Sequence, residues 1–281
     1  ISMKTGMALE SNTFIEFKRT MGSDKKHHSS FMECDFSSED LSAEVLKKLK
    51  SFVQNDDFKS VVITIPAMFN DNQKSATQQA AKLAGFSQVE LLQEPIAAAM
   101  AYGLDEKVKD GQILIFDFGG GTFDVCLVNI EDGIMQVKDT EGDNWLGGKN
   151  LDNAIIDEIL IPYLKNNFKI DTFLEDDIKQ GLLKEALKVK AEEIKINLSF
   201  SNSYDVISNI GEYPEDDEGE EIELDFVVSH DQMKATLGPI FQKAIDIAKE
   251  VLKRNNLAGD SINSLILVGG PTFSPVLREL L

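Results

Sequence analysis

The stretch ILIFDFGGGTFDVCLV, residues 113–128, decides the fold. Its two apolar halves predict strands, and the three glycines between them predict a tight hairpin turn. A second run, SLILVGG (264–270), also predicts an apolar strand that ends in glycines. We expect the strands ILIFDF and SLILVGG to lie in one sheet, with their glycine turns at the same edge.

The rest of the chain alternates helical and strand patterns around these two runs. Residues 37–53 predict a capped helix, and VVITIP (61–66) predicts a strand buried on both faces. A helix over 70–85 follows, bounded by Asn70 and Gly85. This mixture of βα units and hairpins predicts an α/β fold. Between Gly147 and Ser229 the pattern indicates an inserted α+β subdomain.

Composition limits the class of protein. The 281 residues are 42% hydrophobic and 27% charged, which is ordinary for a globular domain of one or two units. The formal net charge is −20, so the surface repels phosphate backbones and anionic lipid, and we expect neither nucleic-acid nor membrane binding. Only two cysteines occur, which favours a reducing, cytoplasmic location. The missing initiator Met and the apolar C-terminal run lead us to expect a fragment.

The turn Gly119–Gly121 is the first candidate binding feature. Glycines without Cβ atoms let backbone N–H groups converge, which forms a concavity for anions. Thr122 adds a hydroxyl, and Asp117 at the strand end is placed to hold a hydrated cation. A plain tight hairpin explains the same residues equally well.

The pair Gly269-Gly270, followed by Thr272, repeats the arrangement of a strand, glycines and a helix start. The sequence contains no Walker loop, and a strand rather than a helix follows the first glycine turn, which excludes a dinucleotide fingerprint. Close packing explains a single glycine pair after a strand, but two glycine turns at the ends of two apolar strands indicate a nucleotide cleft more strongly than either turn alone.

Other polar residues each allow a functional and a purely structural interpretation. Glu192, Lys195 and Ser199 share one helix face and could contact a ribose or base, although a solvated face with an i,i+3 salt bridge fits as well. Glu94 before Pro95 could hold a metal or water, or simply complement a helix dipole. Lys18, beside Arg19, has the character of an exposed lysine.

Five blocks of the chain, in order and spacing, resemble the nucleotide-binding (ATPase) domain of the heat shock protein 70 chaperone family. The blocks are VVITIPAMFNDNQKSATQQAAKLAG (61–85), QEPIAAAMAYGLD (93–105), IFDFGGGTFDV (115–125), GDNWLGGKNLD (142–152) and LILVGGPT (265–272). The resemblance covers about residues 11–281. It implies the actin-like ATPase fold, with two lobes built on ribonuclease-H-like cores.

The resemblance also implies a division of the chain. Residues 1–106 would complete the first lobe, with 1–35 as its outer subdomain and 36–106 as its core. Residues 107–146 and 229–281 would form the second-lobe core. Residues 147–228 would be the inserted outer subdomain of that lobe.

Roles for individual residues follow from the resemblance alone. Residues matching the family's catalytic and magnesium site are Lys18, Glu94, Asp117 and Thr122, with Mg²⁺ held by Asp117 and Glu94 through water. Residues matching the contacts to ATP or ADP are Gly119, Gly120, Gly121, Thr122, Glu192, Lys195, Ser199, Gly269, Gly270 and Thr272. Asp124 lies where the family tunes hydrolysis.

The chain departs from the family pattern in several places. Ile196 and Phe273 stand where the family has arginines beside adenine, so adenine would meet apolar groups or bind more weakly. The family's first phosphate loop would lie upstream of residue 1, and we therefore expect weak hydrolysis. The partners implied are a peptide-binding domain absent from this chain, a J-domain co-chaperone and a nucleotide-exchange factor.

Two other functions fit the same residues. One is a divergent actin-like protein, such as a filament or scaffold ATPase or a sugar-kinase relative, although no aspartate stands out as a sugar-directed base. The other is a nucleotide sensor that binds without cycling, which the substitutions at Ile196 and Phe273 keep open.

Overall fold

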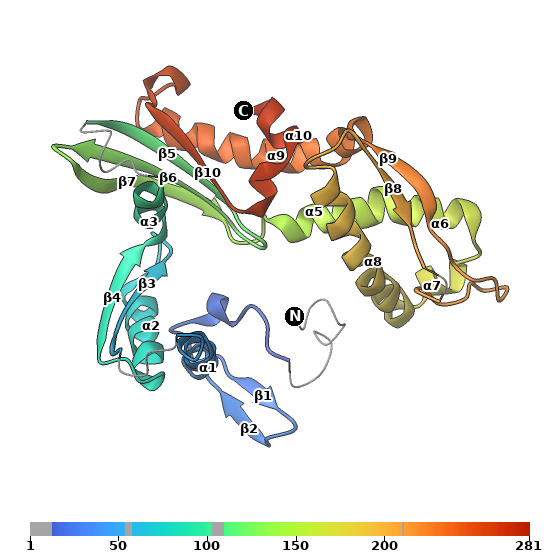
Figure 1. Ribbon diagram of the computed structural model, residues 1–281, viewed down its shortest axis with the longest axis horizontal. Coiled ribbons are helices and arrows are strands. Elements are labelled where there is room, and N and C mark those ends of the chain that lie inside the picture. Colours follow the sequence, from blue (N-terminus) through green and yellow to red (C-terminus); the bar gives the residue numbers. More distant parts are fainter. Residues whose placement is uncertain (1–12, 54–57, 103–109, 210) are drawn as a thin grey trace. The chain divides into compact units, whose positions relative to one another are not determined.

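The computed structural model of the chain describes residues 13–53, 58–102, 110–209 and 211–281 (Figure 1). The chain forms two compact units. The first unit comprises Ile1–Asp110 and Ile130–Val137, and the second comprises Gly111–Asn129 and Lys138–Leu281. Both combine helices and strands, which confirms the α/β class.

The first unit is built on two parallel strands, β3 (Ser60–Ile65) and β4 (Gln88–Gln93). Three helices accompany them in the unit. They are α1 (Ser38–Lys50), α2 (Asp71–Leu83) and α3 (Glu94–Ala101). The predicted caps are confirmed, because Ser37 and Asn70 each form a capping box at the start of their helices. A short 3₁₀ turn, η3 (Phe17–Thr20), and the antiparallel hairpin of β1 (His27–Ser29) and β2 (Cys34–Phe36) complete the described part.

The prediction that VVITIP is buried on both faces is wrong. Val61 and Ile63 pack against the small core of α1 and α2, whereas Val62 between them is 60% exposed. The reason is the width of the sheet, because β3 pairs only with β4 within the described residues. A two-stranded sheet with helices on one face leaves alternate side chains in solvent.

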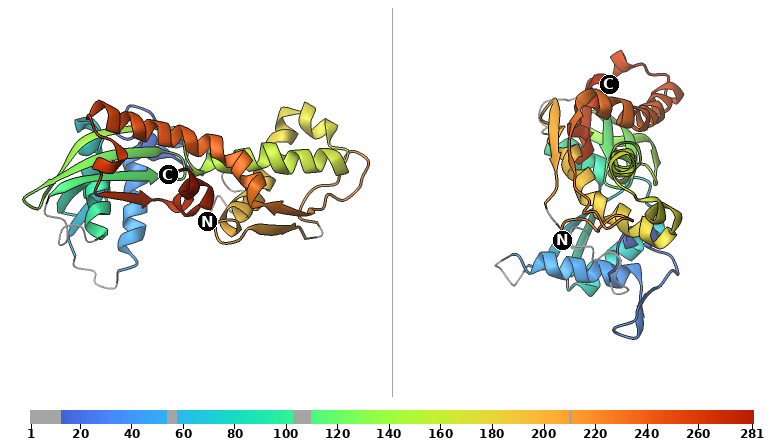
Figure 2. Two further views of the ribbon diagram at one scale, coloured as in Figure 1. Left: turned by 90° about the horizontal axis from the view of Figure 1, so that it is seen from above. Right: turned by 90° about the vertical axis from the view of Figure 1, so that its right-hand side faces the viewer.

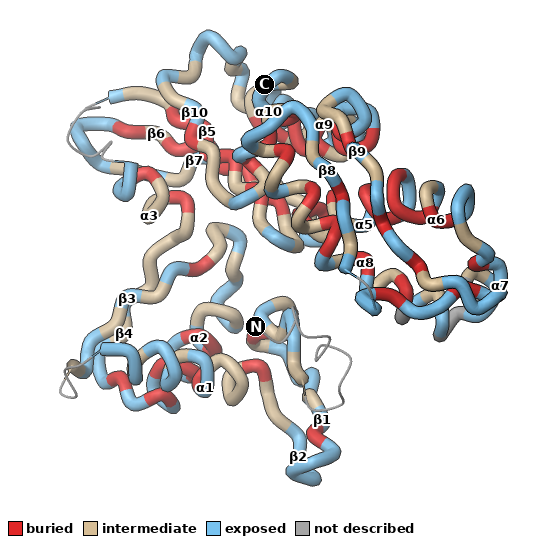
Figure 3. The backbone as a smooth tube through the Cα atoms, turned by 45° about the vertical axis from the view of Figure 1, so that its right-hand side comes forward, coloured by how far each residue is buried: buried red, intermediate tan, exposed pale blue. Residues whose placement is uncertain are grey.

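A four-stranded sheet in the order β10-β5-β6-β7 belongs to the second unit, except for residues 130–137 at the end of β6 and the start of β7, which are grouped with the first unit. The strands are β5 (Gly111–Phe118), β6 (Phe123–Glu131), β7 (Ile134–Asp143) and β10 (Ser264–Val268). Strand β10 runs parallel to β5, with Val268 opposite Asp117, so the prediction that the two apolar runs share a sheet is confirmed. Most residues of β5 and β6 are buried (Figure 3).

Helices and a second small sheet surround these strands. They are α5 (Gly148–Ile155), a π-helical turn η4 (Ile156–Leu160), α6 (Ile161–Asn167), α7 (Asp171–Glu175), α8 (Asp177–Asn197), β8 (Ser203–Ile207), β9 (Asp225–Ser229), α9 (His230–Arg254), η5 (Gly259–Ser261), η6 (Gly270–Phe273) and α10 (Pro275–Leu280). Helix α9 extends along the four-stranded sheet (Figure 2), where Phe241 contacts Phe118 with ring centroids 5.4 Å apart. Within the described residues, no helix has the length and apolar character needed to cross a bilayer.

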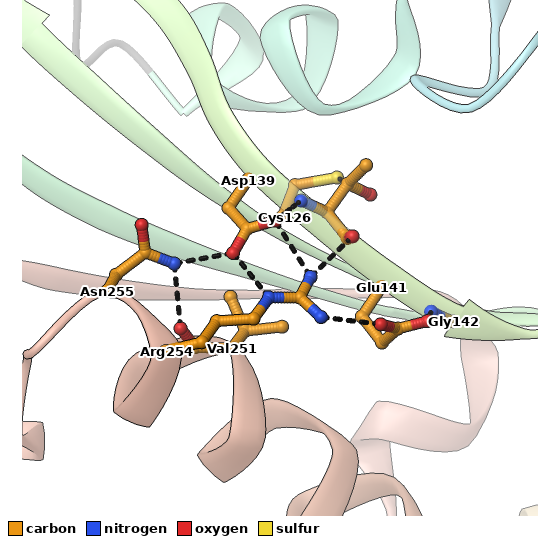
Figure 4. A network of polar contacts seen from close by, with 8 residues as sticks. Cys126, Asp139, Glu141, Gly142, Val251, Arg254 and Asn255 are labelled. Atoms are coloured by element: carbon orange, nitrogen blue, oxygen red, sulfur yellow. Dashed lines mark hydrogen bonds and ion pairs between the residues drawn. The ribbon is translucent and has the colours of Figure 1, made fainter.

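Ion pairs connect the C-terminal end of α9 to β7 (Figure 4). Arg254 donates from Nε and Nη2 to the two carboxylate oxygens of Asp139, at 2.6 and 2.7 Å. Its Nη1 donates to Glu141 Oε2 at 2.6 Å, and Asn255 also donates to Asp139. The Arg254 guanidinium holds the pKa of both carboxyls below their ordinary values. A guanidinium that contacts both oxygens of one carboxylate forms a stronger ion pair than a single contact does.

We predict that Arg254→Ala lowers the free energy of unfolding by about 1 kcal/mol at pH 7, a small value because the network is partly exposed. The lowered carboxyl pKa values contribute stability above about pH 4.5, and that stability disappears as the pH falls through the folded-state values. Urea denaturation at pH 7 and pH 3.5 measures the difference, which should shrink at the lower pH. Lys253→Ala, beside it on the helix, is the matched control. A pH-independent difference would contradict the assignment to these carboxylates.

Candidate functional site

The hairpin turn between β5 and β6 begins directly after Asp117 and Phe118. The N–H of Gly119 donates to the carbonyl of Thr122 at 2.9 Å, which closes the turn. A Cβ atom built on Gly120 would meet nothing within 4 Å, so the backbone is open there. Asp117 is half-buried at the end of β5. The first predicted glycine turn therefore presents bare backbone next to a carboxylate.

The second glycine turn lies against the first one. Because β10 pairs with β5 in parallel register, Gly269 follows the position opposite Asp117. Gly269 has φ +96°, and a Cβ there would lie 2.1 Å from the carbonyl oxygen of Phe118. Only glycine fits this position, since both the backbone angle and the close approach exclude a side chain. The structure thus brings together the two turns predicted from separate strands.

A third glycine segment, Gly147-Gly148, completes the arrangement. The N–H of Gly148 donates to the carbonyl of Gly119, and that of Lys149 to the carbonyl of Gly120, both at 2.9 Å. A Cβ on Gly147 would lie 2.6 Å from Gly121. A Cβ on Gly148 would lie 3.5 Å from both Gly120 Cα and the Pro271 ring, so this segment touches both other turns.

The place of Gly147-Gly148 in this arrangement was not predicted from the sequence, where the pair stood only within a family block. The available signal was a third glycine pair directly before a helix, which is the pattern already noted at Gly269-Gly270. We call the three segments together (119–122, 147–148 and 269–271) the glycine cradle.

The cradle fits a phosphate group bound with magnesium. Bare backbone at Gly120 and Gly270 leaves room for phosphate oxygens, because a Cβ at either position would meet nothing within 4 Å. Within the described ranges, no group of three or more His, Cys, Asp and Glu residues could hold a metal ion by itself. Mg²⁺ commonly binds through one or two carboxylates, water and substrate phosphates, and Asp117 is the carboxylate at the end of β5 beside the cradle.

Of the three polar residues expected on one helix face, Glu192 and Lys195 lie on α8, whereas Ser199 lies in the turn that follows because the helix ends at Asn197, so the prediction is wrong for Ser199. Lys195 and Ser199 both bond internally. Lys195 forms an ion pair with Asp152 of α5 at 2.5 Å. The Ser199 hydroxyl donates to the carbonyl of Lys195 at 2.9 Å. Burial raises the pKa of Asp152, and Lys195 opposes that rise. Glu192, one turn before, is half-buried, and its proximity contributes to the raised pKa of Asp152.

Thr272 is buried, and its hydroxyl donates to the carbonyl of Gly269 at 2.7 Å. This bond fixes the turn η6 at the end of β10. Phe273 closes the turn and is 57% exposed, and its ring centroid lies 6.5 Å from that of Phe200. Ile196, the other replacement for an expected arginine, is also exposed.

In the first unit, the structure brings Lys18 and Glu94 together. Lys18 of η3 donates to Glu94 Oε1 at 2.8 Å, across 76 positions of sequence. Glu94 is the first residue of α3, and Pro95 occupies the first turn of that helix, as expected from the sequence. The resemblance placed both residues near the magnesium site, and their mutual ion pair was not predicted.

A model of the family described as Hsp70 protein matches residues 9–281. A "Chaperone protein DnaK" of Methanothermobacter thermautotrophicus is 35% identical over 274 residues, covering 95% of this chain and 44% of the relative. A protein of the same description from Nitrosopumilus maritimus is 32% identical over 271 residues, covering 95% of this chain and 41% of the relative. The chain therefore spans less than half the length of these relatives.

We predict that Gly269→Ala destabilises the second unit by about 2 kcal/mol or more, because the new Cβ combines an unfavourable φ with a clash against Phe118. Gly270→Ala is the matched control, since a Cβ there meets nothing within 4 Å. Urea denaturation of the two variants and the parent measures the effect. Equal stability of both variants would mean that the two turns are not in contact as described.

Proposed function

Because the chain belongs to the Hsp70 protein family, we propose that it is the ATP-binding portion of a molecular chaperone of that type. The observation that carries the proposal is the glycine cradle, in which three separate segments meet beside the carboxylate of Asp117. A triphosphate bound there would contact backbone groups of the three glycine segments. Such binding suits a chain whose formal net charge is −20.

The proposed chemistry is the hydrolysis of ATP. Bound Mg²⁺ would supply charge neutralisation at the phosphates. Asp117 would hold it through water, Thr122 would offer its hydroxyl to a phosphate oxygen, and Glu94 with Lys18 would orient the attacking water. Phosphoryl transfer needs little covalent participation by a protein, so positioning and electrostatics carry the rate enhancement.

The finer architecture belongs to the same proposal. The family relation supports an actin-like ATPase fold with two lobes and ribonuclease-H-like cores. We propose residues 1–35 and 36–106 as the outer and core parts of the first lobe. Residues 107–146 and 229–281 would form the second-lobe core, with 147–228 inserted in it.

The proposed cellular role extends beyond this chain. Nucleotide state would control peptide clamping by a separate domain, with a J-domain co-chaperone and a nucleotide-exchange factor as partners, in a cytoplasmic stress response. The relatives named as chaperones support this role. A nucleotide sensor that binds without turnover is the second candidate, and the apolar residues Ile196 and Phe273 favour it. Phosphate release from Mg·ATP under single-turnover conditions separates the two, because only a cycling ATPase would release phosphate above the uncatalysed rate.

We predict that Gly120→Ala weakens ADP binding at least tenfold while leaving the fold intact. The added Cβ would meet no protein atom within 4 Å, but it would enter the space assigned to phosphate oxygens. Isothermal titration calorimetry with Mg·ADP should show at least tenfold weaker binding, with an unchanged unfolding midpoint. Gly238→Ala in α9, another position with open space, is the control. Full ADP affinity in Gly120→Ala would place the phosphates elsewhere.

We also predict that Asp117→Asn removes the contribution of magnesium to binding. The parent should bind ADP about tenfold more tightly with Mg²⁺ than with EDTA, and Asp117→Asn should bind equally under both conditions. Thr122→Ala should weaken binding a few fold under both. Asp231→Asn, an exposed carboxylate in α9, should behave like the parent. An undiminished magnesium effect in Asp117→Asn would refute the assigned role.

A further inference from the structure

The turn η3, which carries Lys18, is fixed at both of its ends. Glu16, directly before it, has φ +58°, and Gly22, shortly after it, has φ +72°. A left-handed backbone is strained for a non-glycine residue, so it persists only where neighbouring contacts hold it. The N–H of Gly22 donates to Glu39 Oε1 at 3.2 Å, and a Cβ on Gly22 would lie 2.9 Å from main-chain atoms of Asn72. The turn therefore has a defined position against the N-terminal ends of α1 and α2.

Thr20, the last residue of η3, belongs to a hydrogen-bond network with His27 of β1 and Ser38 of α1. Thr20 Oγ1 lies 2.8 Å from Ser38 Oγ and 3.2 Å from His27 Nε2, and Ser38 Oγ lies 3.5 Å from the same nitrogen. The Thr20 hydroxyl donates its single hydrogen to the carbonyl of Phe17 at 3.1 Å, so it accepts from the other two groups. The network therefore assigns a hydrogen to Nε2 of His27.

The His27 ring is itself held in place. Phe14 meets it edge to face, with ring centroids 6.1 Å apart, and the ring of Phe14 also lies 5.9 Å from that of Phe36 in β2. Ser38 is buried, so solvent competes little for its hydroxyl group. One imidazole thus connects the turn η3, the β1–β2 hairpin and the start of α1.

Lys18 depends on the position of this turn. It lies two residues before Thr20, and its side chain is 59% exposed although it pairs with Glu94 at 2.8 Å. An exposed lysine has many rotamers, and a single ion pair in solvent holds it weakly. The main-chain position that η3 provides therefore decides whether the ammonium group of Lys18 reaches Glu94.

We propose that His27 is a positioning residue for Lys18, acting through the hydrogen bonds of its Nε2–H group in this network. The inference rests on the proposed function for its consequence, because Lys18 and Glu94 are proposed there to orient the attacking water. A displacement of about 1 Å in such a group can slow a reaction about a hundredfold. The proposed phosphate contacts come from the glycine cradle, so loss of His27 should slow hydrolysis without weakening nucleotide binding.

Zero-length crosslinking with a water-soluble carbodiimide tests the position of Lys18 in the absence of nucleotide. The reagent joins a lysine amine to a carboxylate in contact with it, and mass spectrometry of the digested chain quantifies the Lys18–Glu94 product. His27→Leu removes the hydrogen-bond donor but keeps the bulk of the side chain, whereas His27→Gln keeps an N–H group at a similar reach. We expect the yield to fall at least about threefold in His27→Leu and to recover in His27→Gln.

Two controls accompany this measurement. Lys243 and Asp143 of the second unit form an ion pair at 2.6 Å with similar exposure, and their crosslink should be unchanged in both variants. His28, the neighbouring imidazole, is exposed and pairs with Asp35 at 2.8 Å. His28→Leu should therefore behave like the parent chain.

Single-turnover phosphate release from Mg·ATP measures the consequence for the reaction. We expect His27→Leu to lower the rate at saturating Mg·ATP roughly tenfold or more, while the affinity for Mg·ADP changes less than about twofold. His27→Gln should restore the rate. In a Lys18→Ala background, His27→Leu should have no further effect, because the residue that it positions is then absent.

Three results would overturn the inference. They are an unchanged Lys18–Glu94 crosslink or rate in His27→Leu, an equal loss in His27→Leu and His27→Gln, which would indicate a packing role alone, and a further slowing by His27→Leu once Lys18 is replaced. Failure of the parent to release phosphate above the uncatalysed rate would overturn the proposed hydrolysis instead. The crosslink yields would still decide whether His27 holds Lys18 at Glu94.

Discussion

The in-register parallel pairing of β10 with β5 is the constraint on which the second unit depends. Parallel strands end at the same edge of a sheet, so pairing Val268 with Asp117 places Gly269 directly against Phe118. That contact leaves no room for a Cβ atom, and it brings the loop after β10 to the loop after β5. The third segment, Gly147-Gly148, then bonds to the first through main-chain groups. A slip of one residue would separate these groups and turn each strand's buried side chains outward.

Much of this arrangement was predictable from the sequence because strand ends and glycines are local signals. The runs ILIFDF and SLILVGG are apolar, short and followed by glycines, and the structure confirms that they share a sheet. The part played by Gly147-Gly148 was missed because it depends on main-chain bonds between segments about 28 residues apart, which leave no periodic pattern. The ion pair of Lys18 with Glu94 spans 76 positions and is equally invisible to local reasoning.

The error on VVITIP has a different cause. An apolar run reports what its side chains can bury, but the number of strands beside it decides what they do bury. Within the described residues β3 has one neighbour, and Val62 is left exposed. Apolar character alone therefore predicted the strand correctly and its environment incorrectly.

The acidic composition of the chain bears on how the glycine cradle could hold an anion. Lys195 of α8 is engaged in an ion pair with Asp152. In the proposed site, an anionic ligand would be held by backbone groups and by a metal ion. Binding at such a site would depend on shape more than on charge. Glycine-to-alanine substitutions, which add one methyl group to the backbone, therefore test it most specifically.

The most direct test of the central claim is nuclear magnetic resonance of the chain with ¹⁵N-labelled glycine, titrated with Mg·ADP. The account predicts that the amide signals of Gly119–Gly121, Gly147-Gly148 and Gly269-Gly270 shift together at one ligand affinity, while Gly181, Gly238 and Gly259 remain unchanged. Shifts confined to one of the three segments, or spread equally over all glycines, would contradict a single cradle built from three turns.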